Sequence, residues 1–154
     1  MAECHGSIHH LQCLADCGQP VWPADDFSPV VDTANCLLVS DLPLCPACGA
    51  MARPNIMMFG DDGFDGARTQ QQTDRLETWL ARLRQAVVIE IGAGTAIATV
   101  RHFGESTHRP LIRINPGEPA VALRRDIAIP LGALDAMARI ALALQDIAAP
   151  PARL

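Results

Sequence analysis

Four cysteines in two close pairs constrain this chain more than any other feature of its sequence. Cys13 and Cys17 form the first pair, and Cys45 and Cys48 form the second. Four thiolates in two pairs are the ligand set of a closed, tetrahedral structural zinc site. Cys36 is an alternative ligand, because the first pair is one residue wider than the usual CxxC. The spacing favours a ribbon-type zinc site over a redox pair.

The composition supports metal binding by reduced thiols. The first residues lack the basic region and the apolar stretch of a secretory signal, and six cysteines without an export signal indicate metal binding rather than disulfides. Apolar residues make up 49% of the chain, yet no apolar run approaches the roughly 18 residues of a membrane span. We therefore expect a soluble, globular, cytoplasmic protein with no membrane partner.

The charge distribution argues against a nucleic-acid partner. The net charge is −5, and the twelve basic residues are all arginines scattered along the chain. A sequence-independent grip on phosphates requires a basic stripe, which is missing.

The segment 13–50 is rich in Cys, Pro and Asp, with short apolar runs such as residues 36–39 that predict one strand of a small sheet. Such a segment buries too little apolar surface to fold unaided. Bound zinc would supply the missing free energy, on the order of 10 kcal/mol.

From residue 66 the pattern changes to alternating helices and strands. Apolar spacing predicts a helix over 68–85, with Leu76, Trp79, Leu80 and Leu83 on one face, and a buried strand over 87–91. A helix over 96–105 follows, in which Ile97, Val100 and Phe103 can face inward, and then strands over 111–114 and 126–129. Pro150 and Pro151 end a closing helix, whose apolar face consists of Leu134, Met137, Ile140, Ala141 and Leu144. This order predicts an α/β fold with a parallel sheet.

Ligands of such sheets bind beyond the carboxyl ends of the strands, which here carry Gly92, Gly94 and Thr95 and, one strand later, Asn115 and Pro116. By themselves, the glycines are typical of a tight turn and Asn115 of turn chemistry before a proline. The first loop is not a GxGxxG fingerprint, because Ile97 occupies the third glycine position.

In their order along the chain, these motifs resemble the carboxy-terminal portion of the sirtuin family of NAD-dependent protein lysine deacylases. The catalytic His-Gly of sirtuins matches His5 and Gly6, and the four cysteines follow it. The segment 53–61, RPNIMMFGD, resembles the family's Arg-Pro-x-Val-Val-x-Phe-Gly-Glu. Residues 91–95 stand where sirtuins have Gly-Thr-Ser, and residues 112–115 resemble their Ile-Asn strand end.

The resemblance implies a fold and a role for each matched residue. The fold is a partial Rossmann-like parallel sheet with an inserted small zinc-ribbon module, divided into a catalytic-loop remnant at 1–12, a zinc-binding module at 13–50 and part of the NAD-binding domain at 51–154. His5 would be the general base that deprotonates an NAD ribose hydroxyl, after the acyl oxygen has displaced nicotinamide. The remaining roles are zinc ligation by Cys13, Cys17, Cys45 and Cys48, NAD binding by Gly92, Gly94, Thr95, Asn115 and Pro116, and acyl-lysine peptide binding by Ile56, Met57, Phe59, Gly60 and Ile97.

The sequence also departs from the family pattern. Gly92-Ala93-Gly94 lacks the two hydroxyls of Gly-Thr-Ser, and the acid after Phe-Gly is Asp61 rather than Glu. The glycine-rich phosphate loop, the Asp-Phe-Arg segment and the Gln-Asn-x-Asp motif that sirtuins carry before the His-Gly are absent. We therefore expect a chain that is weakly active or inactive alone, and that is either a truncated sirtuin or a protein that needs a complementing N-terminal half.

Two other classes of function are compatible with the same residues. The first is a non-catalytic zinc-ribbon module that binds another protein. The second is a related NAD consumer, either an ADP-ribosyltransferase or an NAD hydrolase, which the altered loop at 92–95 leaves open.

Overall fold

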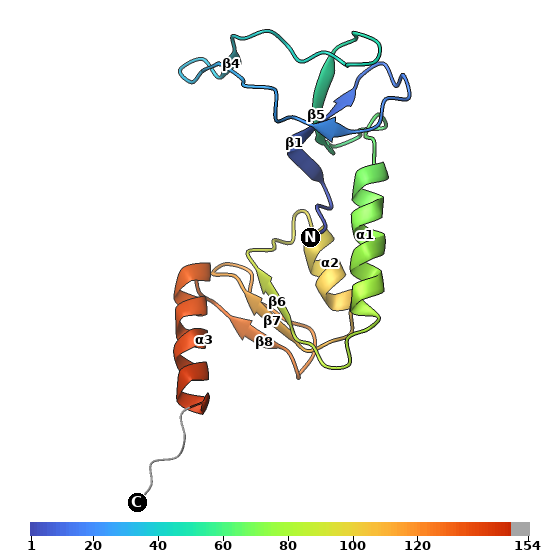
Figure 1. The fold of residues 1–154 in the computed structure, drawn as a ribbon. Helices are drawn as coiled ribbons and strands as arrows, with labels where there is room; N and C mark the ends of the chain where they lie inside the picture. Colours follow the sequence, from blue (N-terminus) through green and yellow to red (C-terminus); the bar gives the residue numbers. More distant parts are fainter. Residues whose placement is uncertain (149–154) are drawn as a thin grey trace, which may run out of the picture. The chain divides into compact units, whose positions relative to one another are not determined.

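A computed structural model describes residues 1–148, and the chain divides into two compact units, of which the first is Met1–Arg82 and the second begins at Leu83. The first unit contains β1 (Gly6–Cys13), β2 (Trp22–Pro23), β3 (Val31–Asp32), β4 (Leu37–Leu38), β5 (Ala52–Ile56) and α1 (Ala67–Leu80). The second contains β6 (Val88–Ile91), α2 (Thr99–Ser106), β7 (Leu111–Ile114), β8 (Ile127–Ile129) and α3 (Ala133–Ala148). Figure 1 shows these elements.

An antiparallel sheet in the order β2-β1-β5 forms the body of the first unit. β1 pairs with β5 from Gly6 opposite Ile56 to Cys13 opposite Ala52, and an irregularity between Ser7 and Leu11 shifts the register. β3 and β4 form a separate two-stranded ribbon, which confirms the short strand predicted within 36–39. The sheet joins two segments about forty residues apart, the His-Gly region and the segment after the second cysteine pair.

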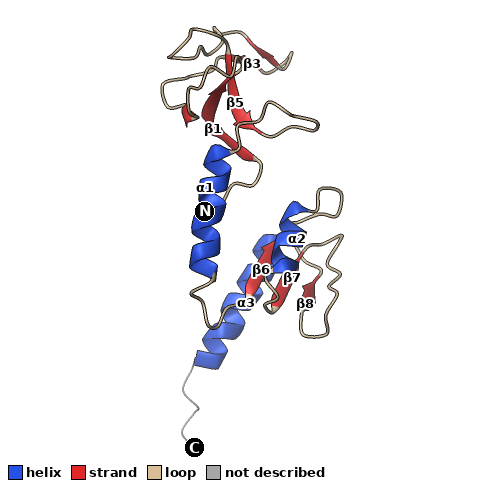
Figure 2. Ribbon diagram, turned by 90° about the vertical axis from the view of Figure 1, so that its right-hand side faces the viewer, coloured by secondary structure: helices blue, strands red, loops and turns tan. Residues whose placement is uncertain are grey.

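A parallel sheet in the order β6-β7-β8 forms the second unit, which confirms the predicted α/β class. Figures 1 and 2 place α2 and α3 on opposite sides of its strands. The predicted strands 87–91, 111–114 and 126–129 correspond to β6, β7 and β8 within one residue at each end. The predicted helices are also present, although α1 ends at Leu80 and α2 starts at Thr99. Pro150 and Pro151, predicted to end the last helix, lie outside the described residues.

The predicted inward faces are wrong in several places. β6 is not buried throughout, because Ile89 and Ile91 are 43% and 47% exposed, whereas Glu90 is 3% exposed. α2 buries Arg101 and Gly104 rather than Ile97, Val100 and Phe103. Gly104 lets α2 approach β6 closely, since a Cβ there would lie 3.2 Å from the carboxylate of Glu90. Gly104 and the paired Glu90 therefore lie at this interface together with the apolar side chains of Val88 and Leu111.

The two long helices also bury other residues than predicted. In α1 the buried residue is Gln72, whose side-chain oxygen accepts a hydrogen bond from the Glu3 amide at 2.7 Å, and Trp79 is exposed. In α3 the buried residue is Ala136, while Leu134, Met137 and Leu144 are exposed. No helix within residues 1–148 combines the length and the hydropathy that crossing a lipid bilayer requires.

Candidate functional site

The four predicted metal ligands meet in one cluster. The Sγ atoms of Cys13, Cys17, Cys45 and Cys48 all lie within 4.8 Å of one another. The Cys13–Cys48 and Cys17–Cys45 sulfur pairs are each separated by 3.6 Å. A tetrahedral zinc ion with Zn–S bonds of about 2.3 Å places its sulfurs about 3.8 Å apart. The cluster therefore fits a zinc ion.

The β1–β5 sheet brings the two cysteine pairs together. Cys13 is the last residue of β1, and the next amide, that of Leu14, donates to the Met51 carbonyl at 3.0 Å just before β5. The second pair lies in a tight turn, where the Gly49 amide donates to the Cys45 carbonyl at 2.9 Å. The strand pairing thus places the two cysteine-bearing turns around one candidate metal site.

The thiols of the cluster influence one another strongly. Desolvation raises the pKa of Cys45, but backbone amides of Cys48 and Ala47 and neighbouring thiols outweigh it and lower that pKa to about 7. For Cys17, a hydrogen bond from the Gln19 backbone lowers the pKa, yet the Cys48 thiol, desolvation and the other thiols raise it to about 12. An ionised thiolate in the cluster thus disfavours ionisation of the neighbouring thiols. A bound divalent cation would stabilise all four thiolates together.

Cys36 lies apart from the cluster. It is exposed at the end of the ribbon turn, and its sulfur lies 3.9 Å from the Thr33 carbonyl oxygen. The alternative in which Cys36 replaces one of the four ligands does not match this geometry.

His5 lies beside the segment that resembles the sirtuin substrate strand. The Met57 amide donates to the His5 carbonyl at 3.0 Å, directly beyond the pairing of Gly6 with Ile56. The His5 side chain is exposed. The structure therefore brings together two predicted site segments that are about fifty residues apart in sequence.

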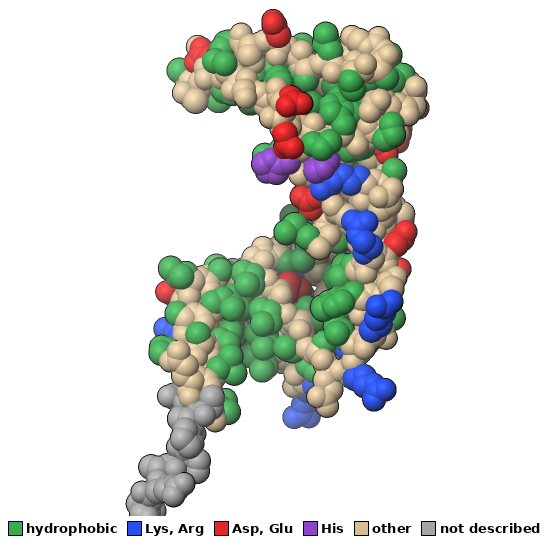
Figure 3. Space-filling view, in the orientation of Figure 1, with side chains coloured by type: hydrophobic (Ala, Val, Ile, Leu, Met, Phe, Trp, Pro, Cys, Tyr) green, Lys and Arg blue, Asp and Glu red, His purple; other side chains and the backbone are tan. Residues whose placement is uncertain are grey.

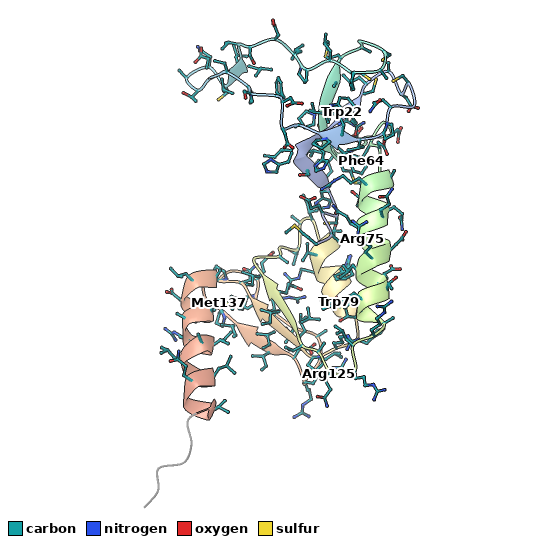
Figure 4. The ribbon with its side chains drawn as sticks, in the orientation of Figure 1. Trp22, Phe64, Arg75, Trp79, Arg125 and Met137 are labelled. Carbon is teal, nitrogen blue, oxygen red and sulfur yellow. The ribbon has the colours of Figure 1, made fainter. Side chains whose placement is uncertain are left out.

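Gly6 makes this close approach possible. Its φ is +80°, and a Cβ at this position would lie 2.0 Å from the Asn55 carbonyl oxygen and 3.1 Å from the ring of Phe64, which Figure 4 labels. Asn55 is itself fully buried, and its amide group donates to Gln12 Oε1 and to the Asp65 carbonyl, both at 2.9 Å. The glycine after His5 is thus required by packing as well as by backbone conformation.

An ion pair holds the loop that follows β5. Arg53 donates to both carboxylate oxygens of Asp61, at 2.8 and 2.7 Å, and to the Ile56 carbonyl at 3.2 Å. Asp61 also accepts from the Met58 amide at 3.3 Å. The hydrogen bonds from Arg53 hold the pKa of Asp61 below its usual range. This explains the arginine at the start of the motif and the acid at its end, roles that the sequence alone did not assign.

The predicted substrate-binding residues form an exposed apolar strand end. Ile56 is half-buried at the end of β5, while Met57 and Phe59 are exposed, Phe59 by 91%. Gly60 turns the chain with a φ of +64°. Ile97 lies in the second unit, in the loop before α2, and is exposed.

In the second unit the predicted NAD-binding residues occupy the carboxyl ends of β6 and β7. Gly92 has a φ of +71° directly after β6, and the space beside its Cα is open. The Thr95 amide and hydroxyl donate to the two carboxylate oxygens of Glu118, at 2.8 and 2.5 Å. These hydrogen bonds from Thr95 lower the pKa of Glu118. Glu118 was missed in the sequence, because it follows Asn115 by three positions in a loop without a distinctive pattern.

Asn115 holds the two strand-end loops together. Its side-chain amide donates to the Ala93 carbonyl at 3.1 Å, and its oxygen accepts from the Gly117 and Glu118 amides at 2.9 Å each. Pro116, next to it, is exposed. Arg101 reaches the same region from α2 and donates to the carbonyls of Ala93, Glu118 and Ala120 at 3.2–3.3 Å.

An open glycine turn, a partly exposed carboxylate and a hydroxyl thus lie together at the carboxyl end of the parallel sheet, the edge at which ligands of such sheets bind. A carboxylate at such an edge is the group that accepts hydrogen bonds from ribose hydroxyls in dinucleotide-binding folds.

A buried ion pair supports the sheet beneath these loops. Arg113 donates to both oxygens of Glu90, at 2.5 and 3.0 Å, and the two side chains are 2% and 1% exposed. Arg113 also reaches the Glu105 carboxylate at 3.0 Å and the Ala120 carbonyl at 2.6 Å. The neighbouring carboxylate of Glu90 raises the pKa of Arg113 despite its burial.

Comparison with known proteins confirms the predicted resemblance. The chain is 26% identical over 139 residues to an NAD-dependent protein deacylase of Thermus thermophilus, covering 90% of this chain and 48% of the relative. It is 27% identical over 117 residues to an NAD-dependent protein deacetylase of Thermotoga maritima, covering 75% and 42%. No protein-family model matches the chain. The chain thus spans about half the length of the curated relatives it matches.

Solved structures confirm the sirtuin fold. A Sir2 homologue in complex with NAD has a TM-score of 0.56 at 20% identity, covering 94% of this chain and 50% of that one. A mutant Sir2 homologue in complex with ADP-ribose has a TM-score of 0.61 at 20% identity, with 95% and 53% covered. A third, Sir2Tm bound to a propionylated peptide, has a TM-score of 0.54 at 20% identity, with 95% and 56% covered.

Proposed function

We propose that this chain, which has the fold of part of a sirtuin, is the zinc-bearing portion of an NAD-dependent protein lysine deacylase. Such an enzyme transfers the acyl group of a modified lysine to ADP-ribose and releases nicotinamide. The sequence similarity to bacterial deacylases supports the reaction class. The solved complexes with NAD and with a propionylated peptide support the two substrates.

One observation carries the proposal: the backbone contact between His5 and Met57. His5, the proposed general base, thus adjoins an exposed apolar strand end. Ile56, Met57, Phe59 and Gly60 would bind an extended peptide there, with main-chain hydrogen bonds providing affinity and the side chains contacting the acyl-lysine.

His5 would accept a proton from a ribose hydroxyl of NAD. An imidazole suits this role, because its ordinary pKa of about 6.5 leaves it mostly neutral at physiological pH. Two contacts would position the backbone that flanks the bound peptide. One is the packing of Gly6 against the Asn55 carbonyl, and the other is the Arg53–Asp61 ion pair.

NAD would supply the electrophilic ribose carbon and nicotinamide as the leaving group. Its adenosine half would be held by Gly92, Gly94 and Thr95, and by Asn115 and Pro116, with Ile97 near the acyl group. We add Glu118 to this set, because its carboxylate is partly exposed between the two loops. The zinc ion would have a structural role, since its four sites are all filled by thiolates.

We further propose that efficient turnover needs a complementing N-terminal half. The relatives are about twice as long as this chain. In addition, β6 and β8 each have one side without a strand partner within the described residues, and such edges readily pair with another strand.

The test is release of nicotinamide from NAD, with and without an acetyl-lysine peptide. The zinc-loaded chain is assayed alone and with the unmatched half of the Thermus deacylase added in trans. His5→Ala should abolish release, whereas His9→Ala, a nearby exposed histidine, should retain it. We expect little release from the chain alone and peptide-dependent release from the mixture.

Other outcomes distinguish the alternatives. Release that does not need the peptide would support an NAD hydrolase, and labelling of protein by ADP-ribose would support an ADP-ribosyltransferase. Absence of release in the mixture would contradict the enzymatic proposal and favour a protein-binding zinc-ribbon module. Ordinary turnover by the chain alone would contradict the need for a second half.

A further inference from the structure

The zinc module carries the whole excess negative charge of the protein. Residues 14–52 contain five aspartates and no lysine or arginine, and the rest of the chain has twelve acidic and twelve basic residues. A zinc ion bound by four thiolates adds a further charge of about −2 to the same region. In Figure 3, red and green side chains but no blue ones are visible over the segment that carries β4.

An apolar groove lies between this acidic segment and the β1–β5 sheet. Its volume is about 400 Å³, and the side chains that matter here are Ile8 and Leu11 of β1, Leu38 of β4, and Phe27, Leu42 and Pro54. A smaller hollow of about 210 Å³ adjoins it, shares Leu11 and Phe27, and adds Trp22 and Asp26. All these residues belong to the first unit. We call the two hollows together the module groove.

Asp26 lines the smaller hollow, and two further carboxylates adjoin lining residues in the sequence. Asp25 and Asp26 precede Phe27, and Asp41 precedes Leu42, and all three aspartates are exposed. Leu42 itself is 52% exposed, so the apolar floor is accessible to a large ligand. The groove thus offers an apolar floor with a negative rim.

Charge complementarity decides between the possible occupants. A second copy of this chain would bring the same negative rim, and a fatty acid would bring a carboxylate, so both are repelled. A peptide segment with apolar side chains next to Lys or Arg satisfies the floor and the rim together. We propose that the module groove docks such a basic, apolar segment of a partner protein, independently of the deacylase site.

The test measures binding of three fluorescent nonapeptides to the zinc-loaded chain. They share a central Leu-Val-Leu and carry Arg, Gln or Glu on both flanks, and none contains an acylated lysine. The Arg peptide should bind, its affinity should fall with added salt, and the Glu peptide should not bind.

Matched variants separate the groove from general charge effects. The double variant Asp25→Asn with Asp26→Asn, and separately Leu42→Gln, should each weaken the Arg peptide about tenfold. Asp74→Asn with Glu77→Gln removes the same charge from α1 and should leave binding unchanged. His5→Ala should also bind normally, which separates this proposal from the proposed deacylase function.

Several results would overturn the proposal. These are no binding of the Arg peptide, equal binding of the Arg and Glu peptides, or equal weakening by the α1 variant. Concentration-dependent dimerisation that Leu42→Gln abolishes, measured by sedimentation, would show instead that a second copy covers the groove.

Discussion

Gly6 links sequence, packing and the candidate site at a single position. Its positive φ disfavours any other residue, and the Asn55 carbonyl occupies the space that a side chain would need. The conformational penalty and the clash can be measured separately, because Gly60 has a similar φ of +64° and no atom within 4 Å of the place that a Cβ would take.

We predict that Gly6→Ala destabilises the first unit far more than Gly60→Ala. The Gly60 variant should cost about 1–2 kcal/mol, the penalty of a left-handed residue. The Gly6 variant must also separate β1 from β5, so it should lower the urea midpoint further, monitored by tryptophan fluorescence. Equal urea midpoints for the two variants would contradict this prediction, because they would show that β1 and β5 move apart at no cost to relieve the clash with the Asn55 carbonyl.

Glu118 supports a prediction about pH. Because Thr95 holds the pKa of Glu118 below its ordinary value, the ionised carboxylate stabilises the loop in the folded protein. This contribution is present above the ordinary pKa of about 4.3 and is lost as the pH falls through the lower folded pKa.

The amide exchange protection of Thr95 should therefore be high near pH 6 and fall below about pH 4. Glu118→Gln should remove this pH dependence, and the Glu118 carboxyl carbon should titrate below the usual range by NMR. A Thr95 amide whose protection is the same in both proteins at every pH would contradict the inferred bond.

At the scale of elements, the candidate metal site of the first unit depends on two cysteine-bearing turns that the β1–β5 sheet brings together. Each cysteine pair is local, but only the β1–β5 register brings the pairs together. The small apolar core of this unit makes bound zinc a major source of its stability.

We predict one zinc ion per chain, bound by Cys48 and not by Cys36. Cys48→Ser should lose zinc and the structure of the module, while Cys36→Ser should retain both. Zinc content by atomic absorption and the visible spectrum of the cobalt-substituted protein provide the measurements. Removal of zinc by a chelator should unfold the wild-type module reversibly. Full zinc content in Cys48→Ser would exclude the four-cysteine site.

The second unit depends on a buried charge pair. Glu90→Gln leaves the Arg113 guanidinium buried with a weaker partner, and loss of a partner from a buried pair costs about 3–5 kcal/mol. Glu105→Gln removes a carboxylate that is 45% exposed and should cost about 0–1 kcal/mol. Hydrogen exchange of the β7 amides reports both values. A small loss of stability in Glu90→Gln would contradict this prediction, because the Ala120 carbonyl and the Glu105 carboxylate would then be enough to stabilise the buried Arg113 guanidinium.

At the scale of the whole molecule, the second unit presents apolar side chains at the surface of its parallel sheet. Ile89, Ile91 and Ile127 are 43–53% exposed on the second unit, and both outer strands have an open edge within the described residues. Figure 3 shows this apolar surface in green near the β6–β8 sheet. It supports the proposed complementation, in which added strands or helices would bury these side chains.

The predicted features that the structure confirms depend on residues close together in sequence. The cysteine pairs, the strand at 111–114 and the turn at Gly92 each follow from local spacing or from the backbone freedom of glycine. The features that prediction missed depend on distant partners. The inward turn of Arg101 follows from carbonyls at 93, 118 and 120, and the burial of Glu90 follows from Arg113 on the neighbouring strand.

By itself, the sequence determined the two cysteine pairs of the candidate metal site, with Cys36 as an alternative ligand, the α/β order of elements and the resemblance to sirtuins, because short spacings encode each of them. Only the tertiary structure decided that the His5 carbonyl meets the Met57 amide, that Glu118 binds Thr95, and that an apolar groove lies between the acidic segment and the β1–β5 sheet. The reason is physical: strand register and side-chain pairing arise from contacts between segments far apart in the chain, and local periodicity does not specify which segments meet.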